Sequence, residues 1–246
     1  RVLVPENFNF AYDVVDVYAA AEPDRIAIVW CNEQGEQRTI TFGELKTWSD
    51  RIANYLAGIG LRKGDPVMLI LKRRYEYWYC LLALHKLGAV AIPATHLLTA
   101  RDIEHRNKAA AVKMIISVND EHVMQHVDAA QAHSPALRWK VALHGGRPGW
   151  LGLLDDLDGV SAVFIRPTGD AGTGNTDRSM LYFTSGTTGM PKMVDHNFTY
   201  PLGHILTAKY WQRVIAGGLH LTVADTGWAK ASWGKIYGQW LAGTAI

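Results

Sequence analysis

Residues 66–118 read PVMLILKRRYEYWYCLLALHKLGAVAIPATHLLTARDIEHRNKAAAVKMIISV. Three short apolar runs, at 66–71, 89–93 and 113–118, alternate in this stretch with helical patterns near 75–87 and 99–110. Short strands separated by helices of about 10–15 residues are typical of βαβ units with a parallel sheet. The runs are apolar without alternation, as in strands covered on both faces. The stretch therefore predicts an α/β fold.

The same alternation continues on both sides of this stretch. Thr41 and Glu44 have the spacing of a capping box, which predicts the start of a helix that ends at Gly60. The other predicted elements are an amphipathic helix at 8–20, a β-hairpin formed by 26–30 and 38–42, a helix at 120–132 and a strand at 139–143. Residues 144–177 are polar and rich in turn residues, which indicates a boundary within the chain.

A second stretch, LYFTSGTTGMPKM at 181–193, indicates a binding site for phosphate. Gly186 and Gly189 permit backbone conformations in which consecutive N–H groups point at an anion. Lys192 adds a mobile positive charge, and Pro191 fixes the turn before it. Hydroxyl donors come from Thr184, Ser185, Thr187 and Thr188. The alternative is a surface turn with a solvated lysine, but these features directly after a strand favour the phosphate site.

The loop differs from the P-loop of kinases and GTPases. That motif needs glycine before its lysine and a hydroxyl after it, whereas Pro191 and Met193 flank Lys192 here. The string TSGTTGMPK instead resembles the phosphate-binding signature of the AMP-forming adenylating enzymes. That superfamily joins acyl- and aryl-CoA synthetases, peptide-synthetase adenylation domains and beetle luciferases. The resemblance extends through residues 50–71 and 84–94 and covers nearly the whole chain.

A third stretch, VADTGWAKASWGKIYGQW at 223–240, resembles the aromatic motif that lines the carboxylate-substrate pocket of this superfamily. Together with PKMVDH at 191–196, it is similar to the acetyl-CoA and medium-chain acyl-CoA synthetase branch. The resemblance implies an acyl-binding set of Trp228, Lys230, Trp233, Tyr237 and His196. The alternative is that these aromatic residues pack a helix against the sheet and that His196 is structural. Asp225 is interpreted as part of a turn.

The resemblance also implies two flavodoxin-like subdomains with the substrates between their strand ends. We expect residues 1–170 to form the first α/β subdomain, with an N-terminal helix and hairpin. Residues 171–246 are expected to begin the second, with the phosphate loop and the acyl-pocket motif. A helix at 229–242 followed by a strand start at 243–246 predicts the N-terminal part of a longer enzyme. The remainder, with a barrel and a C-terminal domain, would hold the catalytic lysine, so no catalytic residue is assigned here and the chain alone is expected to be inactive.

The implied reaction joins a short- or medium-chain, branched or aryl carboxylic acid to the thiol of CoA. The carboxylate attacks the α-phosphate of ATP, bound with Mg²⁺, and CoA then displaces AMP from the acyl-adenylate. The departing pyrophosphate requires preorganised donors and cations. Three alternatives stay open: an adenylating enzyme that passes the acyl group to a carrier protein, a phosphotransferase that makes an acyl phosphate, and a non-catalytic nucleotide- or acyl-binding module.

Composition narrows the partners and the compartment. The 25 basic and 23 acidic residues give a net charge of +2, and no basic run interleaves with aromatic residues, so we expect no nucleic-acid partner. No stretch reaches the roughly 18 apolar residues of a membrane span. Cys31 and Cys80 are interpreted as buried free thiols of a reducing compartment, either the cytoplasm or, after removal of a transit peptide, the mitochondrial matrix. We interpret the nine histidines other than His196 as scattered without the spacing of metal ligands, and predict no metal site.

Overall fold

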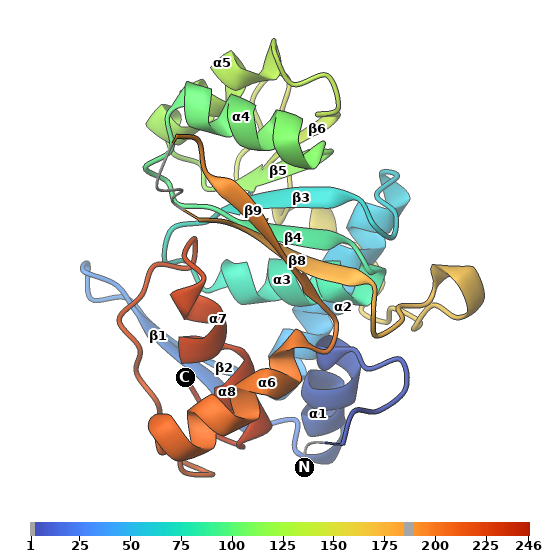
Figure 1. Cartoon of the computed structure of the whole chain (residues 1–246), viewed down its shortest axis with the longest axis vertical. Coiled ribbons are helices and arrows are strands. Elements are labelled where there is room, and N and C mark those ends of the chain that lie inside the picture. The colour runs from blue at the N-terminus through green and yellow to red at the C-terminus, as the bar shows by residue number, and fades with distance from the viewer. Residues whose placement is uncertain (1–2, 185–188) are drawn as a thin grey trace.

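The computed structural model describes residues 3–184 and 189–246, which are built around a seven-stranded sheet (Figure 1). The strand order is β7–β6–β5–β3–β4–β8–β9, and every neighbouring pair is parallel except β8 and β9. The strands are β3 (Pro66–Ile70), β4 (Val90–Pro93), β5 (Met114–Ser117), β6 (Trp139–Ala142), β7 (Leu151–Gly152), β8 (Arg178–Thr184) and β9 (Lys192–Asn197). The predicted α/β fold with a parallel sheet is confirmed, and the antiparallel edge strand β9 is an addition to it.

Helices cover both faces of this sheet (Figure 1). They are the π-helical segment η1 (Ala11–Asp16), α1 (Val17–Ala21), α2 (Phe42–Gly58), α3 (Glu76–Leu87), α4 (Ala100–Ala110), α5 (Glu121–Gln131), α6 (Tyr200–Leu206), the π-helical segment η4 (Thr207–Trp211), α7 (Lys230–Lys235), α8 (Tyr237–Leu241) and the 3₁₀ segments η2 (Asp155–Leu157) and η3 (Gly169–Ala171). Over the described ranges, no helix has both the length and the apolar character needed to cross a membrane.

The order of connections creates a switch point between β3 and β5. From β3 the chain passes through α3 to β4 on one side, and from β4 it returns through α4 to β5 on the other side of β3. Because such crossovers are right-handed, the reversal places α3 on one face of the sheet and α4 on the other. From β5 the chain continues through α5 to β6, away from β3, so the loops after β3 and β5 diverge at the carboxyl edge, where open α/β sheets bind their ligands.

The central strands are apolar because both faces of the sheet are covered. All residues of β4 and β5 are buried, as are the last four residues of β3. Met68 on β3 lies opposite Ile92 on β4 and Ile115 on β5. Burying a side chain of this kind contributes roughly 1.5–3 kcal/mol. The prediction made from the unbroken apolar runs is thus confirmed for these strands.

The N-terminal hairpin and the start of α2 form as predicted. β1 (Ile26–Cys31) and β2 (Gln37–Thr41) pair antiparallel in a separate two-stranded sheet. The side chain of Thr41 accepts a hydrogen bond from the Glu44 amide at 3.2 Å, and the Glu44 carboxylate accepts one from the Thr41 amide at 3.0 Å. The interpretation of both cysteines as buried is wrong for Cys31, which is exposed because the end of the hairpin lies beyond the core; Cys80 is buried.

Strand β8, which leads into the phosphate loop, continues the same sheet. Ala91 of β4 pairs with Met180 of β8 in parallel orientation. Strands on both sides of residue 170 therefore share one sheet. The division of the chain at that residue into two subdomains stays a prediction.

The predicted helix at 229–242 is in fact two helices, α7 and α8. The chain breaks at Ile236, where φ is −136° and ψ is −74°. At this break the Trp233 carbonyl accepts hydrogen bonds from the side-chain amides of Gln212 and Gln239, both at 3.2 Å, in place of a helical backbone donor. The strand start expected at 243–246 is reduced to a single parallel bridge between Ala245 and Leu219.

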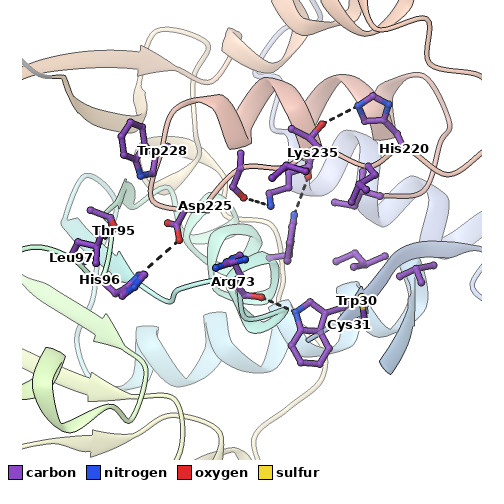
Figure 2. A pocket seen from close by; sticks show the side chains of 18 residues that line it. Trp30, Cys31, Arg73, Thr95, His96, Leu97, His220, Asp225, Trp228 and Lys235 are labelled. Atoms are coloured by element: carbon purple, nitrogen blue, oxygen red, sulfur yellow. Dashed lines mark hydrogen bonds and ion pairs between the residues drawn. The ribbon is translucent and has the colours of Figure 1, made fainter. Parts of the chain in front are cut away.

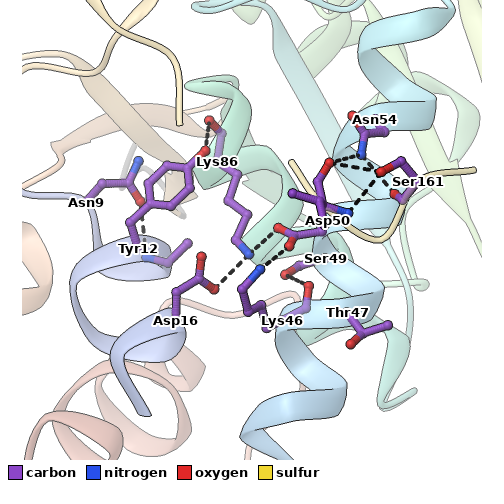
Figure 3. A network of polar contacts seen from close by, with 12 residues as sticks. Asn9, Tyr12, Asp16, Lys46, Thr47, Ser49, Asp50, Asn54, Lys86 and Ser161 are labelled. Atoms are coloured by element: carbon purple, nitrogen blue, oxygen red, sulfur yellow. Dashed lines mark hydrogen bonds and ion pairs between the residues drawn. The ribbon is translucent and has the colours of Figure 1, made fainter. Parts of the chain in front are cut away.

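A buried ion network joins α3 to α2 and η1 (Figure 3). Lys86 Nζ donates to Asp50 Oδ1 at 2.6 Å and to Asp16 Oδ1 at 2.8 Å, and neither Lys86 nor Asp50 has exposed side-chain surface. Lys46 also pairs with Asp50. Burial raises the pKa of Asp16, and the Lys86 ammonium opposes that shift. Four charges of balanced sign therefore hold the N-terminal helices against the rest of the fold.

Candidate active site

Basic side chains follow β3 at the carboxyl edge of the sheet. Lys72 and Arg73 come directly after this strand. Lys72 Nζ lies 2.6 Å from Asp120 Oδ2, and Asp120 also caps α5 by accepting a hydrogen bond from the Val123 amide at 3.1 Å. This ion pair joins the loop after β3 to α5, which follows the neighbouring strand β5. The Lys72–Asp120 ion pair thus fixes the loops after β3 and β5 relative to each other.

The Asp-Thr-Gly-Trp segment at 225–228 lies directly against this edge (Figure 2). Thr226 Oγ1 donates a hydrogen bond to the Lys72 carbonyl, just after β3. Gly227 packs against the end of β4 so closely that a Cβ atom there would lie 2.3 Å from the carbonyl carbon of Ala94. A residue with a side chain does not fit at this position without backbone movement. The segment is therefore attached to the ends of both β3, which borders the switch point, and the neighbouring strand β4.

The described ends of the phosphate loop lie at the same edge. Thr184 ends β8, and Lys192 begins β9 directly opposite it. Gly189 has a φ of +122°, which glycine adopts without strain. The Pro191 carbonyl lies 3.2 Å from Nε2 of His105 in α4. The other predicted phosphate ligands, Ser185, Gly186, Thr187 and Thr188, lie outside the described residues.

A cavity of about 600 Å³ opens beside the 225–228 segment (Figure 2). Its apolar walls come from β1, the loop after β4 and the segment before Asp225, and include Ile28, Val29, Trp30, Leu97, Leu221 and Val223. Arg73 and Lys235 bring positive charge to the same space. Burial lowers the pKa of Lys235, and the Asp225 carboxylate opposes that shift. A mostly apolar space with a few polar groups is typical of a small-molecule site.

The residues predicted to bind the acyl group do not gather at this cavity. Trp228 lines it and is 62% exposed. Lys230 is exposed at the start of α7. Trp233 packs against Trp211, with 5.2 Å between the ring centroids. Of the predicted set, Trp228 is thus the residue that borders the cavity, and the acyl-binding roles stay predictions.

Tyr237 and His196 belong to an aromatic cluster on α8, α6 and β9. Tyr237 has no exposed surface; its hydroxyl donates to Met180 Sδ at 2.7 Å, and its ring meets Phe10 edge-on at 4.9 Å. The His196 ring stacks on Tyr200 with 3.9 Å between centroids, and burial lowers the pKa of His196. These are packing contacts, as in the alternative interpretation that the aromatic residues pack a helix against the sheet and that His196 is structural.

Sequence reasoning assigned none of Arg73, His96 and Lys235 to a binding site, and interpreted the basic cluster at 72–75 as a solvated helix end, although all three residues line the cavity. A signal was present for two of them, because Arg73 and His96 are polar residues that follow the apolar strands β3 and β4 at the carboxyl edge of the parallel sheet. His96 Nδ1 lies 3.9 Å from Asp225 Oδ2. Asp225 Oδ1 accepts a hydrogen bond from the Gly227 amide at 2.8 Å, which confirms the predicted turn.

The two ends of a Thr/Gly-rich stretch and an Asp-Thr-Gly-Trp segment thus meet at the carboxyl edge of a mainly parallel α/β sheet, the edge at which nucleotide-binding enzymes with such sheets hold their ligands. The chain belongs to the AMP-binding enzyme family, whose model matches residues 15–245. The fold is similar to that of the anthranilate CoA ligase AuaEII in complex with anthranoyl-AMP, with a TM-score of 0.82 and 21% identity over 99% of this chain and 45% of that one. It is also similar to an acyl-CoA synthetase of Brucella canis, with a TM-score of 0.80 and 20% identity over 97% of this chain and 42% of that one.

Closer sequence relatives are mitochondrial acyl-coenzyme A synthetases. The chain is 37% identical to human ACSM5 over 254 residues, which covers all of this chain and 43% of that protein. It is 36% identical to mouse ACSM5 over 256 residues and 34% identical to rat ACSM4 over 251 residues. The chain therefore spans less than half the length of these relatives. The resemblance to the AMP-forming acyl-CoA synthetases is confirmed.

Proposed function

We propose that this chain supplies the phosphate loop and part of the acyl site of an AMP-forming acyl-CoA synthetase. The observation that carries the proposal is the meeting of two motifs at one edge of the sheet. Thr184 and Lys192 border the loop at the end of β8, and Gly227 lies against the end of the adjacent strand β4. Both ends face the region where open α/β sheets bind nucleotides.

The loop at 184–192 is proposed to bind the β- and γ-phosphates of ATP. Its hydroxyl and backbone donors would meet the charge that develops on the departing pyrophosphate, and Lys192 would add a cation. Magnesium would enter with the nucleotide. Within the described ranges, no group of three or more histidine, cysteine, aspartate or glutamate side chains is arranged to hold a metal.

The cavity beside Trp228 is proposed to take the acyl group of a short- or medium-chain, branched or aryl acid. Its volume of about 600 Å³ falls within the range of typical small-molecule pockets. Its apolar walls suit a hydrocarbon chain, and the cations Arg73 and Lys235 suit a carboxylate on the way to the reacting centre. Lys230, Trp233, Tyr237 and His196, also proposed for this site, would act indirectly. The first three would act through α7 and α8, which carry them, and His196 through its stacking on Tyr200.

The proposed reaction has two steps. A carboxylate oxygen of the acid bonds to the α-phosphorus of ATP, and the bond to pyrophosphate breaks. The sulfur of CoA then attacks the acyl carbonyl, gives its proton to solvent or base, and displaces AMP. The names of the relatives favour CoA over a carrier protein as the acceptor and the mitochondrial matrix over the cytoplasm as the location.

The proposal is tested by ATP–pyrophosphate exchange with the complete gene product and a series of acids from acetate to octanoate, with benzoate and branched acids. We expect exchange that depends on one class of acid, with AMP as the nucleotide product. ADP as the product would establish phosphotransfer instead, and ATP binding without exchange for any acid would establish a binding module.

Lys192→Ala and Lys209→Ala form a matched pair for this assay, because both lysines are exposed. Lys209 lies in η4, away from the carboxyl edge of the sheet. Loss of a cation at the pyrophosphate should slow exchange by a factor of about 100 or more for Lys192→Ala, with little change for Lys209→Ala. Equal exchange rates in the two variants would contradict the assignment of Lys192.

A further inference from the structure

Two histidines on the outer side of α5 face each other. His122 and His126 are four residues apart in a helix, so their side chains lie one turn apart on the same side. Their Nε2 atoms are 3.2 Å apart, and their ring centroids are 4.5 Å apart. His122 is exposed and His126 is half-buried. The interpretation of the histidines as scattered overlooked this H-x-x-x-H spacing and is corrected here.

We propose that His122 and His126 form an exchangeable site for a divalent transition-metal ion such as Zn²⁺ or Cu²⁺. Bonds from the metal to imidazole nitrogen are about 2.0–2.1 Å long, so Nε2 atoms 3.2 Å apart subtend an angle of about 100° at the ion. This angle lies between those of octahedral and tetrahedral coordination. Both rings therefore reach one ion without any change in the helix backbone.

Helix α5, which carries His122 and His126, packs its opposite side against the core. Val123 and Val127, which alternate with the histidines, are buried in the core. The start of the helix is capped by Asp120, which accepts a hydrogen bond from the Val123 amide and pairs with Lys72. A site on a packed helix loses little conformational entropy on binding, because the two ligand positions are already fixed relative to each other.

The donor set selects the class of metal. Neutral imidazole suits zinc, copper and nickel, whereas magnesium and calcium prefer oxygen ligands. Within the described residues, no third histidine, cysteine, aspartate or glutamate completes the set, so water fills the remaining positions and the ion exchanges freely. This site is therefore separate in place and in chemistry from the Mg²⁺ that accompanies ATP.

Metal binding replaces the hydrogen bond between the two rings. In that bond one Nε2 carries a proton that it donates to the other. A bound ion needs the lone pair of both Nε2 atoms, so this proton moves to Nδ1 of the same ring or leaves.

The test uses the 246-residue chain without an affinity tag, stripped of metal by a chelator. Zn²⁺ is titrated by calorimetry, and Cu²⁺ is followed by electron paramagnetic resonance, which detects the coordinating nitrogens. We expect one Zn²⁺ per chain at this site and a spectrum of two imidazole nitrogens. His122→Ala and His126→Ala should each weaken binding at least tenfold. The matched control is His133→Ala, because His133 is exposed just after the same helix and lies beside Glu104.

Circular dichroism of each variant shows whether the helix is intact, and both histidines lie outside the core, so the variants should fold. Unchanged affinity in His122→Ala or His126→Ala would overturn the proposal, as would an equal loss in His133→Ala. A stoichiometry of one ion per two chains would overturn the mononuclear site. Mg²⁺ in place of Zn²⁺ should give no binding that depends on the two histidines.

Discussion

Replacing Lys86 with methionine would test how far the packing of the N-terminal helices depends on the ion network of Figure 3. Methionine keeps the unbranched chain of the lysine and removes its charge. In the native chain Lys86 contacts both Asp16 and Asp50, and Asp50 is fully buried. After the substitution Asp50 keeps Lys46, whereas Asp16 loses its ion-pair partner. The cluster then carries a net negative charge.

The expected cost follows from these distances. At an effective dielectric constant of about 20, contacts at 2.6 and 2.8 Å each correspond to about 6 kcal/mol of gross attraction. In the native state the cost of removing the ions from water cancels much of this attraction. When one partner is removed, the remaining buried charge still bears that desolvation cost but has lost the attraction. Lys86→Met should therefore lower the free energy of unfolding by about 3–5 kcal/mol, out of a total of about 5–15 kcal/mol for a typical domain.

Urea unfolding followed by circular dichroism measures this difference. Lys108→Met is the surface control, because Lys108 pairs with Glu104 one helical turn away, and it should cost about 0.5 kcal/mol or less. The Lys86→Met and Asp50→Asn double variant should cost about 1–3 kcal/mol less than the sum of the single variants. Loss of Lys86 raises the pKa of Asp16 further, so the deficit should shrink as the pH falls. A cost equal to that of Lys108→Met, or strict additivity, would refute the reasoning.

Three further predictions concern single side chains. Burial lowers the pKa of His85 to about 3, whereas an unfolded histidine titrates near 6.5. Below about pH 6.5 the unfolded chain thus binds a proton that the folded chain excludes, and the free energy of unfolding should fall by up to about 1.4 kcal/mol per pH unit. Urea unfolding near pH 7 and pH 5 should show a smaller loss of this free energy for His85→Phe than for the native chain. Gly227→Ala should cost about 1–3 kcal/mol, because the new Cβ atom meets the backbone of Ala94, whereas Gly203→Ala in α6, with nothing near its Cβ, should be neutral or stabilising in thermal unfolding. Thr41→Ala should cost about 1 kcal/mol by removing half of the capping box at α2, measured in the same way.

The sheet was predictable from sequence because its strands and helices are coded locally. Apolar runs covered on both faces mark β3, β4 and β5, and hydroxyl caps mark the starts of α2 and α4. The break at Ile236 was not predictable, because it depends on side-chain amides that reach the Trp233 carbonyl from Gln212 and Gln239. β9 is largely exposed, so its own sequence carries no apolar signal. It is defined as a strand by its antiparallel pairing with β8.

Parts of the candidate site were predictable from sequence and other parts were not, for the same reason. Its two motifs are short continuous stretches, and their residue types alone indicated phosphate and acyl chemistry. The cavity walls combine Ile28 and Leu221, which are far apart in the chain, so no local pattern marks them. Arg73 and His96 are intermediate cases. They are polar residues after apolar strands, and their sequence positions indicate a shared site only when the strand order shows that β3 and β4 are neighbours in the sheet.

Strand β4 contacts both motifs of the candidate site and so fixes their positions relative to each other. It pairs with β8, which leads into the phosphate loop, and its carboxyl end at Ala94 contacts Gly227 of the acyl motif. The helix that follows it, α4, reaches the far end of the phosphate loop through His105 and Pro191. In the proposed reaction a carboxylate must come within about 3–3.5 Å of the α-phosphorus in the right orientation. A single buried strand that supports both proposed binding motifs limits their relative movement, so a substitution at Gly227 should disturb the proposed adenylation.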